Sequence, residues 1–366
     1  MHKIEIEKTT STGGMVDYDQ NSSAQQSIIA TQDEQIRTLA TRIGTAEPEF
    51  RIVDYGCGPG TSAITAVKPA IEAYRRNNKN SPISVCHADQ QGNDWNALFK
   101  LVYSKSGYQS ENSSIRTEAS IGSFYSQRVA SNSVDLATCF AASHWLSHAV
   151  RLNSPGTIWF ADLEGDARSQ MAKLARNDWK NFLGLRALEL KSGGFLFVST
   201  LGSIPDSSEA NGAAASGRGI YRALQVVAQT MADDSLLDSE ILDHFVFSLW
   251  FLTEQEAREP IETDKNLSKV FEIEKIQVVP APTNSTDFFA PLLPNPAAYA
   301  KKYAGYIRAF ADSTLRTQLF APSAKNAEDE NRLADEFYKR LEALYHSQQP
   351  QYAFELWHLG MILRKK

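Results

Sequence analysis

The sequence lacks several features that would define other classes of protein. It has no excess of basic residues: 37 Lys and Arg stand against 43 Asp and Glu, for a formal net charge of −6. Because nucleic-acid-binding domains usually present a basic face, we expect no nucleic-acid partner. Its three cysteines, Cys57, Cys86 and Cys139, show no CxxC spacing. They therefore predict neither a disulfide framework nor a zinc site.

Long apolar runs are also missing. No stretch approaches the roughly 20 apolar residues of a membrane span, and residues 1–14 lack the apolar core of a signal peptide. We therefore expect a cytoplasmic protein without membrane attachment. With 366 residues, of which 42% are hydrophobic, the chain can bury a sizeable core.

Apolar runs alternate with helical patterns along the chain. The runs predicted as strands are residues 51–53, 83–88, 134–140, 157–160, 194–200, 271–279 and 353–363. The helical patterns are residues 25–42, 61–76, 92–102, 168–190, 221–231, 297–310 and 330–345. Such alternation predicts an α/β protein whose mostly parallel sheet is covered by helices on both faces.

Residues 51–61, RIVDYGCGPGT, form the most informative stretch. A buried strand ends at Asp54, and Gly56 and Gly58 then form a turn that a bulky side chain could not adopt. A helix follows, so backbone N–H groups and a helix N-terminus approach one place, where a ligand can bind. A dinucleotide site would need a third glycine where Thr61 stands, and an acid about 20 residues further on. A tight turn without a ligand remains an alternative.

The acid and glycines resemble the pattern of class I methyltransferases, which bind S-adenosylmethionine. Further motifs follow in the order of one family: residues 18–25 (YDQNSSAQ), 88–96 (ADQQGNDWN), 122–125 (GSFY) and 143–147 (SHWLS). Together they resemble the SABATH carboxyl methyltransferases, which methylate salicylate, benzoate, jasmonate and indole-acetate and include the caffeine N-methyltransferases. The resemblance covers most of residues 13–200.

The resemblance implies a Rossmann-like class I methyltransferase sheet, mostly parallel, with an antiparallel terminal strand pair and a helical cap. It implies S-adenosylmethionine as cofactor and S-adenosylhomocysteine as product. Asp54 would hold the methionine amino group, Asp89 the ribose hydroxyls, and Phe124 the adenine. The full cofactor-binding set that we expect is Tyr18, Ser22, Asp54, Gly56, Gly58, Asp89, Gln90, Ser123, Phe124 and Cys139.

By the same resemblance, Gln25, His144 and Trp145 hold the substrate carboxylate. Neutral donors suit this role, because a buried arginine would stabilise the ground state more than the transition state. A carboxylic acid is already ionised at pH 7, so no general base is required. Without the resemblance, Trp145 fits core packing better than ligand contact.

Two further groups of residues are candidates for the site. Tyr221, Phe247 and Trp250 are predicted to line the substrate pocket, although an aromatic cluster is also typical of a core. His144 and His148 have the i, i+4 spacing of a metal-binding helix. Trp145 stands where such a motif carries glutamate, and no third ligand is evident, so we predict no metal.

We therefore predict a carboxyl O-methyltransferase that forms the methyl ester of a small, largely apolar acid by in-line transfer. One alternative is an N- or O-methyltransferase of a small heterocycle or phenol. Another is a non-catalytic ligand-binding protein, because Ala141 and Gln90 depart from the family pattern. The resemblance also implies a homodimer.

The expected organisation follows from these assignments. Residues 1–24 would close over the site, and residues 25–202 would form the cofactor-binding core. Residues 203–264 and 283–347 would form the helical cap, and residues 265–282 and 348–366 would add the terminal strands. The Ser, Ala and Gly-rich residues 203–219 fit an exposed loop or a lid hinge.

Overall fold

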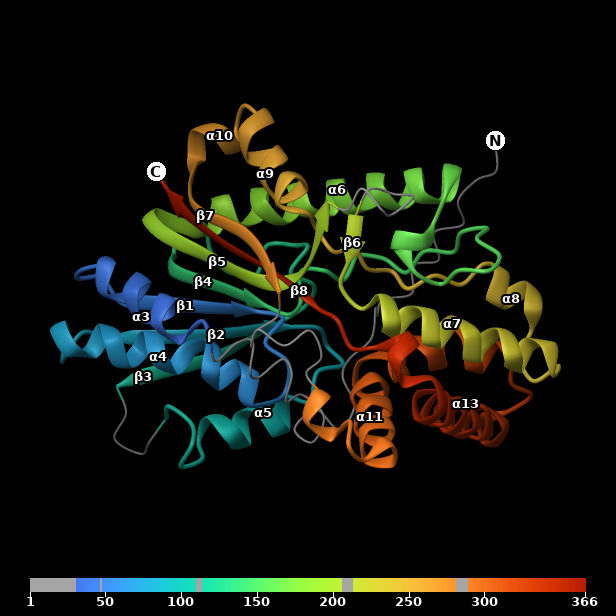
Figure 1. Cartoon of the computed structure of the whole chain (residues 1–366). Coiled ribbons are helices and arrows are strands. Elements are labelled where there is room, and N and C mark those ends of the chain that lie inside the picture. The colour runs from blue at the N-terminus through green and yellow to red at the C-terminus, as the bar shows by residue number, and fades with distance from the viewer. Residues whose placement is uncertain (1–30, 47, 110–113, 206–212, 281–288) are drawn as a thin grey trace.

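One mostly parallel sheet organises the chain (Figure 1). A computed structural model describes residues 31–46, 48–109, 114–205, 213–280 and 289–366. Within these residues the strands follow the order β3-β2-β1-β4-β5-β8-β7, and β6 pairs with the end of β5. The strands are β1 Phe50–Tyr55, β2 Ile83–Asp89, β3 Ile115–Ile121, β4 Val134–Phe140, β5 Leu190–Pro205, β6 Ala213–Ala215, β7 Phe271–Pro280 and β8 Trp357–Lys365.

Strand direction confirms the predicted sheet. β1 to β5 pair in parallel, whereas β8 runs antiparallel to both β5 and β7. The antiparallel terminal pair is therefore present as expected. Because the carboxyl ends of parallel strands meet at one edge, the loops after β1, β2, β3 and β4 lie near one another, where open α/β sheets bind ligands.

Helices cover both faces of the sheet. Successive side chains of a strand point to opposite faces of the sheet. Ile52 and Leu136 pack with helices α3 (Asp33–Arg42) and α4 (Thr61–Asn77), whereas Val53 and Ala137 pack with α6 (Gly165–Glu189) on the other face. This explains why the strands read as continuous apolar runs rather than alternating ones. The helices beside the sheet are α3 Asp33–Arg42, α4 Thr61–Asn77, α5 Trp95–Val102, α6 Gly165–Glu189, α9 Glu254–Thr263 and α10 Leu267–Val270.

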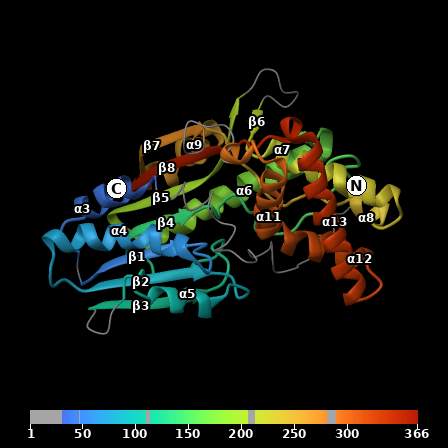
Figure 2. The same cartoon turned by 60° about the horizontal axis from the view of Figure 1, so that its bottom comes forward.

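A second group of helices gathers beyond the carboxyl edge of the sheet (Figures 1 and 2). These are α7 Arg218–Asp233, α8 Ser239–Asp243, α11 Pro296–Leu315, α12 Ala321–Ser323 and α13 Ala327–Gln348. Aromatic stacking joins them: the rings of Tyr303 in α11 and Tyr345 in α13 lie 4.1 Å apart and nearly parallel. None of the described helices combines the length and the apolar character needed to cross a membrane.

Three features of the sheet differ from the sequence prediction. The end of β5 and the whole of β6 lie in residues 203–219, which were predicted as an exposed loop or a lid hinge. β3 was not predicted, because this edge strand alternates between half-buried and exposed positions and so shows no apolar run. Conversely, residues 157–160 are not a strand of the sheet. They lead into a 3₁₀ turn, Phe160–Asp162, and bury Trp159 and Phe160 among aromatic side chains of the cap region.

Candidate cofactor and substrate site

The glycine turn after β1 lies directly against the loop that follows β4. Gly56 has φ +69°, and a Cβ at this position would lie 2.3 Å from the Cβ of Ala142. The N–H of Gly56 donates to the carbonyl of Ala88, 2.7 Å away, which ties the turn to the end of β2. Only glycine combines this backbone conformation with such a close approach. Gly56 therefore holds the loops after β1, β2 and β4 together.

Asp54, the acid at the end of β1, has one carboxylate oxygen available. Its side chain is buried, and Oδ1 accepts a hydrogen bond from the Thr138 hydroxyl in β4 at 2.8 Å. Oδ2 is buried and accepts no hydrogen bond from the described residues. Leaving a buried charged acceptor without a partner is costly, so this oxygen is a position where a bound cation would be stabilised.

Asp89, the acid at the end of β2, supports the glycine turn. Its Oδ2 accepts from the backbone N–H of Gly58 and its Oδ1 from that of Gln90, both at 2.7 Å. Burial raises the pKa of Asp89, and these two hydrogen bonds act in the opposite direction. Each carboxylate oxygen keeps a further lone pair for a ligand hydroxyl. Gln90 contributes its backbone to this arrangement.

Phe124 provides an apolar surface beside the turn. It follows β3, is largely buried, and its ring lies 3.6 Å from the position a Cβ of Gly56 would take. The neighbouring Ser123 is exposed. The hydroxyl of Tyr125 donates to the carbonyl of Trp145 at 2.7 Å, which connects this segment to the loop after β4.

A buried ion pair that was not predicted from the sequence anchors the same segment. Arg186 and Glu189, at the end of α6, are fully buried and lie 2.6 Å apart. Arg186 also donates to the carbonyl of Phe124 at 3.0 Å and stacks on the ring of Tyr55. Glu189 accepts from the Tyr55 hydroxyl at 2.7 Å and from the backbone N–H of Arg128. The pair therefore connects β1 to the segment that carries Phe124.

His144 and Trp145 lie together in the loop after β4. The Nδ1 of His144 forms a hydrogen bond with the Thr200 hydroxyl in β5 at 2.8 Å. Burial lowers the pKa of His144 to about 3, so its imidazole is neutral at physiological pH. Trp145 is half-buried, and its ring lies 5.6 Å from that of His144. Residues 143–148 form turns and a bridge rather than a helix, so His144 and His148 do not share a helix face.

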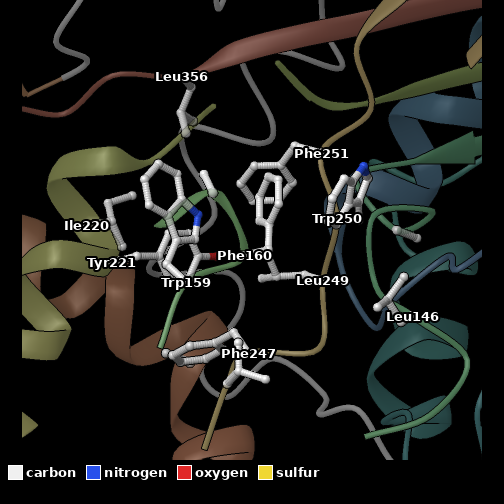
Figure 3. Close-up of a cluster of buried hydrophobic side chains, with 14 of the residues drawn as sticks. Leu146, Trp159, Phe160, Ile220, Tyr221, Phe247, Leu249, Trp250, Phe251 and Leu356 are labelled. Carbon is white, nitrogen blue, oxygen red and sulfur yellow. The ribbon is translucent and has the colours of Figure 1, made fainter. Parts of the chain in front are cut away.

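Aromatic side chains surround this loop on the side of the cap (Figure 3). Trp159 stacks on Tyr221, with ring centroids 5.8 Å apart and planes 8° apart. Phe247 lies edge-on to Tyr221 at 5.3 Å. The His144 ring contacts Phe251 at 5.6 Å, so the cluster reaches the loop after β4. Of these rings, Trp159 and Phe251 were not predicted as pocket residues.

Trp250 and Cys139 were also predicted for the site, but the indole N–H of Trp250 is bonded elsewhere and Cys139 is buried in the sheet. The indole N–H of Trp250 donates to Glu256 at 3.1 Å, within the capping box that starts α9. Cys139 is fully buried, and burial raises the pKa of its thiol to about 12. Tyr18, Ser22 and Gln25 lie outside the described residues.

The arrangement fits S-adenosylmethionine, for which the structure offers three complementary features. Asp54 presents to a cationic ammonium group a buried acceptor that takes no hydrogen bond from the described residues. The space beside Gly58 is open as far as the described residues are concerned, since a Cβ there would meet none of their atoms within 4 Å, so a ligand can approach the backbone closely. Phe124 offers an apolar ring against which a base can pack.

The comparisons with known proteins agree with this fit. The family model of SAM-dependent carboxyl methyltransferases matches residues 8–365. Gibberellic acid methyltransferase 2 of Arabidopsis thaliana is 23% identical over 262 residues, which are 66% of this chain and 67% of that protein. Loganic acid O-methyltransferase of Catharanthus roseus is 23% identical over 251 residues. That alignment spans 65% of this chain and 64% of the relative, slightly less than two thirds of its length.

A solved structure supports the fold. A structure of loganic acid methyltransferase with SAH matches this chain with a TM-score of 0.73 and 21% sequence identity, covering 95% of this chain and 96% of that one. At this identity the likeness shows the fold alone, and the fold agrees with the predicted class. The match over residues 8–365 confirms what the ordered motifs indicated: the chain belongs to the family of SAM-dependent carboxyl methyltransferases.

Proposed function

We propose that this chain transfers a methyl group from S-adenosylmethionine to the carboxylate of a small, largely apolar acid, and so forms its methyl ester. The observation that carries the proposal is the position of a neutral, buried His144 among aromatic rings, on the loop that meets the glycine turn. The names of the relatives, which refer to gibberellic and loganic acids, support an acid as the substrate.

Residues at the ends of three strands of the sheet, β1, β2 and β3, would hold the cofactor. S-adenosylmethionine supplies an electrophilic methyl group on its sulfonium sulfur. Asp54 would accept from the ammonium group through Oδ2, and Asp89 would accept from the ribose hydroxyls through its remaining lone pairs. Ser123 and Phe124 would lie against the adenine. Burial of Asp54 strengthens its interaction with a cation, because the surroundings screen the charges poorly.

Neutral groups would orient the substrate carboxylate. The substrate is already ionised at pH 7, so the protein needs to align its oxygen with the methyl group and exclude water rather than remove a proton. His144 uses Nδ1 for Thr200, which leaves Nε2 for a carboxylate oxygen. Trp145 would donate its indole N–H, and Gln25 its side-chain amide.

The aromatic cluster would accommodate the rest of the acid. Tyr221 and Phe247 belong to this cluster together with Trp159. An apolar, weakly polarisable enclosure favours the reaction, because the opposite charges of carboxylate and sulfonium disappear as the bond forms. The indole N–H of Trp250 is already bonded to Glu256, so its contribution would come from its ring face.

Methyl transfer can be tested with labelled S-adenosylmethionine and a panel of aromatic, indolic, terpenoid and fatty acids, together with phenols and nitrogen heterocycles of similar size. We expect label in base-labile esters of one class of acid. Transfer only to phenols or ring nitrogens would contradict the proposal. Such acceptors lose a proton, so their rates would rise with pH between 6 and 8.

A pair of tryptophan variants tests the site itself. Trp145→Phe keeps an aromatic ring, although a smaller one, and removes the indole N–H. It should lower kcat/KM for the acid by roughly tenfold, the effect of one hydrogen bond to a charged group. Trp179→Phe is the matched control, since the indole N–H of Trp179 donates to the carbonyl of Ala257 away from the site. Equal losses of kcat/KM in both variants would argue against a substrate role for Trp145.

Several finer expectations belong to this proposal. The chain would act as a homodimer in the cytoplasm and serve secondary metabolism, with residues 1–24 closing over the bound ligands. The division into a cofactor-binding core, a helical cap and two terminal strands also stays a prediction. Sedimentation analysis of the purified protein would check the oligomeric state.

A further inference from the structure

A buried histidine faces the free oxygen of Asp54. His87 lies in β2, directly opposite Asp54 in the register of the sheet, and is completely buried. Its Nδ1 lies 3.7 Å from Asp54 Oδ2. Both atoms are buried, and neither forms a hydrogen bond with the described residues. The two atoms therefore have each other as their nearest complementary group on this side of the imidazole.

The other side of the imidazole belongs to a chain of polar groups. His87 Nε2 lies 2.7 Å from the Tyr108 hydroxyl, and the Thr117 hydroxyl lies 3.4 Å from the same oxygen. The Gln109 amide nitrogen lies 2.7 Å from the Thr117 oxygen and 2.6 Å from the carbonyl of Ile115. Tyr108 and Gln109 follow α5, whereas Ile115 and Thr117 lie in β3.

This chain has one consistent direction of hydrogen bonding. A backbone carbonyl only accepts, so the Gln109 side chain must turn its NH₂ group toward Ile115, and that group also donates to Thr117. The Thr117 hydroxyl donates to the Tyr108 oxygen at 3.4 Å, and we infer that Tyr108 in turn donates its own proton to His87 Nε2. In a neutral imidazole with Nε2 accepting, the proton is on Nδ1, the nitrogen that faces Asp54.

We propose that His87 is a positioning residue for cofactor binding: the Gln109–Thr117–Tyr108 chain fixes the tautomer whose Nδ1–H holds Asp54 Oδ2 in place for the cofactor ammonium. This inference rests on the proposed cofactor role of Asp54. At 3.7 Å the N–H dipole acts on the carboxylate electrostatically rather than through a full hydrogen bond. A neutral donor suits the task, because it orients the carboxylate without cancelling the negative charge that the ammonium requires.

Two substitutions of His87 separate its two nitrogens. An asparagine side chain can place an N–H near the position of Nδ1, whereas the longer glutamine places its amide near Nε2. His87→Gln should therefore raise the Kd of S-adenosylhomocysteine, measured by calorimetry, and the KM of S-adenosylmethionine by about tenfold. Its kcat at saturating cofactor should change less than threefold. His87→Asn should keep both constants within about threefold of the wild type. Equal constants for the wild type and both variants would overturn the inference.

The tautomer can be observed directly by NMR. In protein labelled with ¹⁵N-histidine, the ring nitrogen shifts distinguish Nδ1–H from Nε2–H, and the His87 signals are those absent from His87→Gln. If neither His87 variant folds, Tyr108→Phe identifies the same signals, because it removes only one oxygen beside Nε2. We expect the Nδ1–H form in the wild type. An Nε2–H form would overturn the inference.

One further variant separates this inference from the proposed function. If Asp54→Asn binds S-adenosylhomocysteine as well as the wild type, Asp54 does not hold the cofactor and the role of His87 is refuted with it, whereas methyl transfer to an acid in the substrate panel would still support the proposed function. If Asp54→Asn loses binding while His87→Gln does not, only the role of His87 is refuted.

Discussion

Replacement of Asp54 by asparagine should separate cofactor binding from folding. The substitution keeps the shape of the side chain, and its amide oxygen can still accept from Thr138, as Oδ1 does now at 2.8 Å. The amide nitrogen would then take the place of Oδ2, which is buried and available for a cation. A bound ammonium would therefore meet a second donor where it now meets an anion.

The expected loss of binding free energy follows from the burial of Asp54, which is only 2% exposed. A hydrogen bond to a charged group contributes about 1.5–3 kcal/mol. Two unit charges about 3 Å apart at an effective dielectric constant of about 20 attract by roughly 5 kcal/mol before desolvation is subtracted. We therefore expect Asp54→Asn to lose about 3 kcal/mol of binding free energy, which corresponds to an approximately hundredfold weaker affinity.

Calorimetric titration with S-adenosylhomocysteine measures the affinity, and thermal unfolding with and without the ligand measures its coupling to stability. The wild type should be stabilised by the ligand, and Asp54→Asn should lose most of that shift. The ligand-free proteins should differ by about 1 kcal/mol or less. The new amide nitrogen would face Nδ1–H of His87, which is unfavourable, but the substitution also removes a buried charge, which is favourable.

Asp135→Asn is the matched control. Asp135 is also a buried carboxylate of the sheet, but it lies in β4 near the opposite edge, where it accepts from Lys191 and from the backbone of Arg51. This control should lose stability and keep its affinity for S-adenosylhomocysteine. An affinity of Asp54→Asn within threefold of the wild type would refute the assignment of Asp54.

Three further outcomes follow from the structure. Gly56→Ala should destabilise the fold by about 1–3 kcal/mol and abolish cofactor binding, because its Cβ would lie 2.3 Å from Ala142 in a left-handed backbone; unchanged urea unfolding would contradict this. Glu189→Gln leaves the fully buried Arg186 without its carboxylate and should cost about 3–5 kcal/mol, measured by urea unfolding, with Glu164→Gln as an exposed control. The pKa of His144 is lowered from 6.5 to about 3, so the unfolded state binds more protons between these values. Stability from this group is fully present above pH 6.5 and should fall by up to about 1.4 kcal/mol per pH unit as the pH decreases, whereas kcat for an acid should stay flat from pH 6 to 8.

Much of the sheet was predictable because its strands are buried on both faces. Residues 83–88 and 134–140 read as apolar runs, and both were predicted as strands and form β2 and β4. β3 was not predicted, because it lies at the edge of the sheet, is only partly covered and so has no apolar run. Residues 157–160 show the reverse error. Their apolar side chains are buried in the cap region, and burial alone does not distinguish a strand from a turn.

The site likewise contains residues that were predicted from the sequence and contacts that were not. Asp54, Gly56 and Asp89 were predicted because each stands at the end of a recognisable strand, inside a motif whose spacing is local. The partners of these residues come from elsewhere in the chain. Thr138 and His87 reach Asp54 only through strand register, and Ala142 reaches Gly56 only through the packing of two loops. No spacing pattern contains such contacts.

The amino-acid sequence by itself determined the glycine turn, most of the strands and helices, and the family, because these depend on residues that are neighbours along the chain. Tertiary structure alone decided that Oδ2 of Asp54 accepts no hydrogen bond from the described residues, that His87 faces this oxygen, and that Arg186 and Glu189 anchor the Phe124 segment. The physical reason is that burial and pairing of polar groups arise when distant segments come together, and their energies depend on the neighbours that folding supplies.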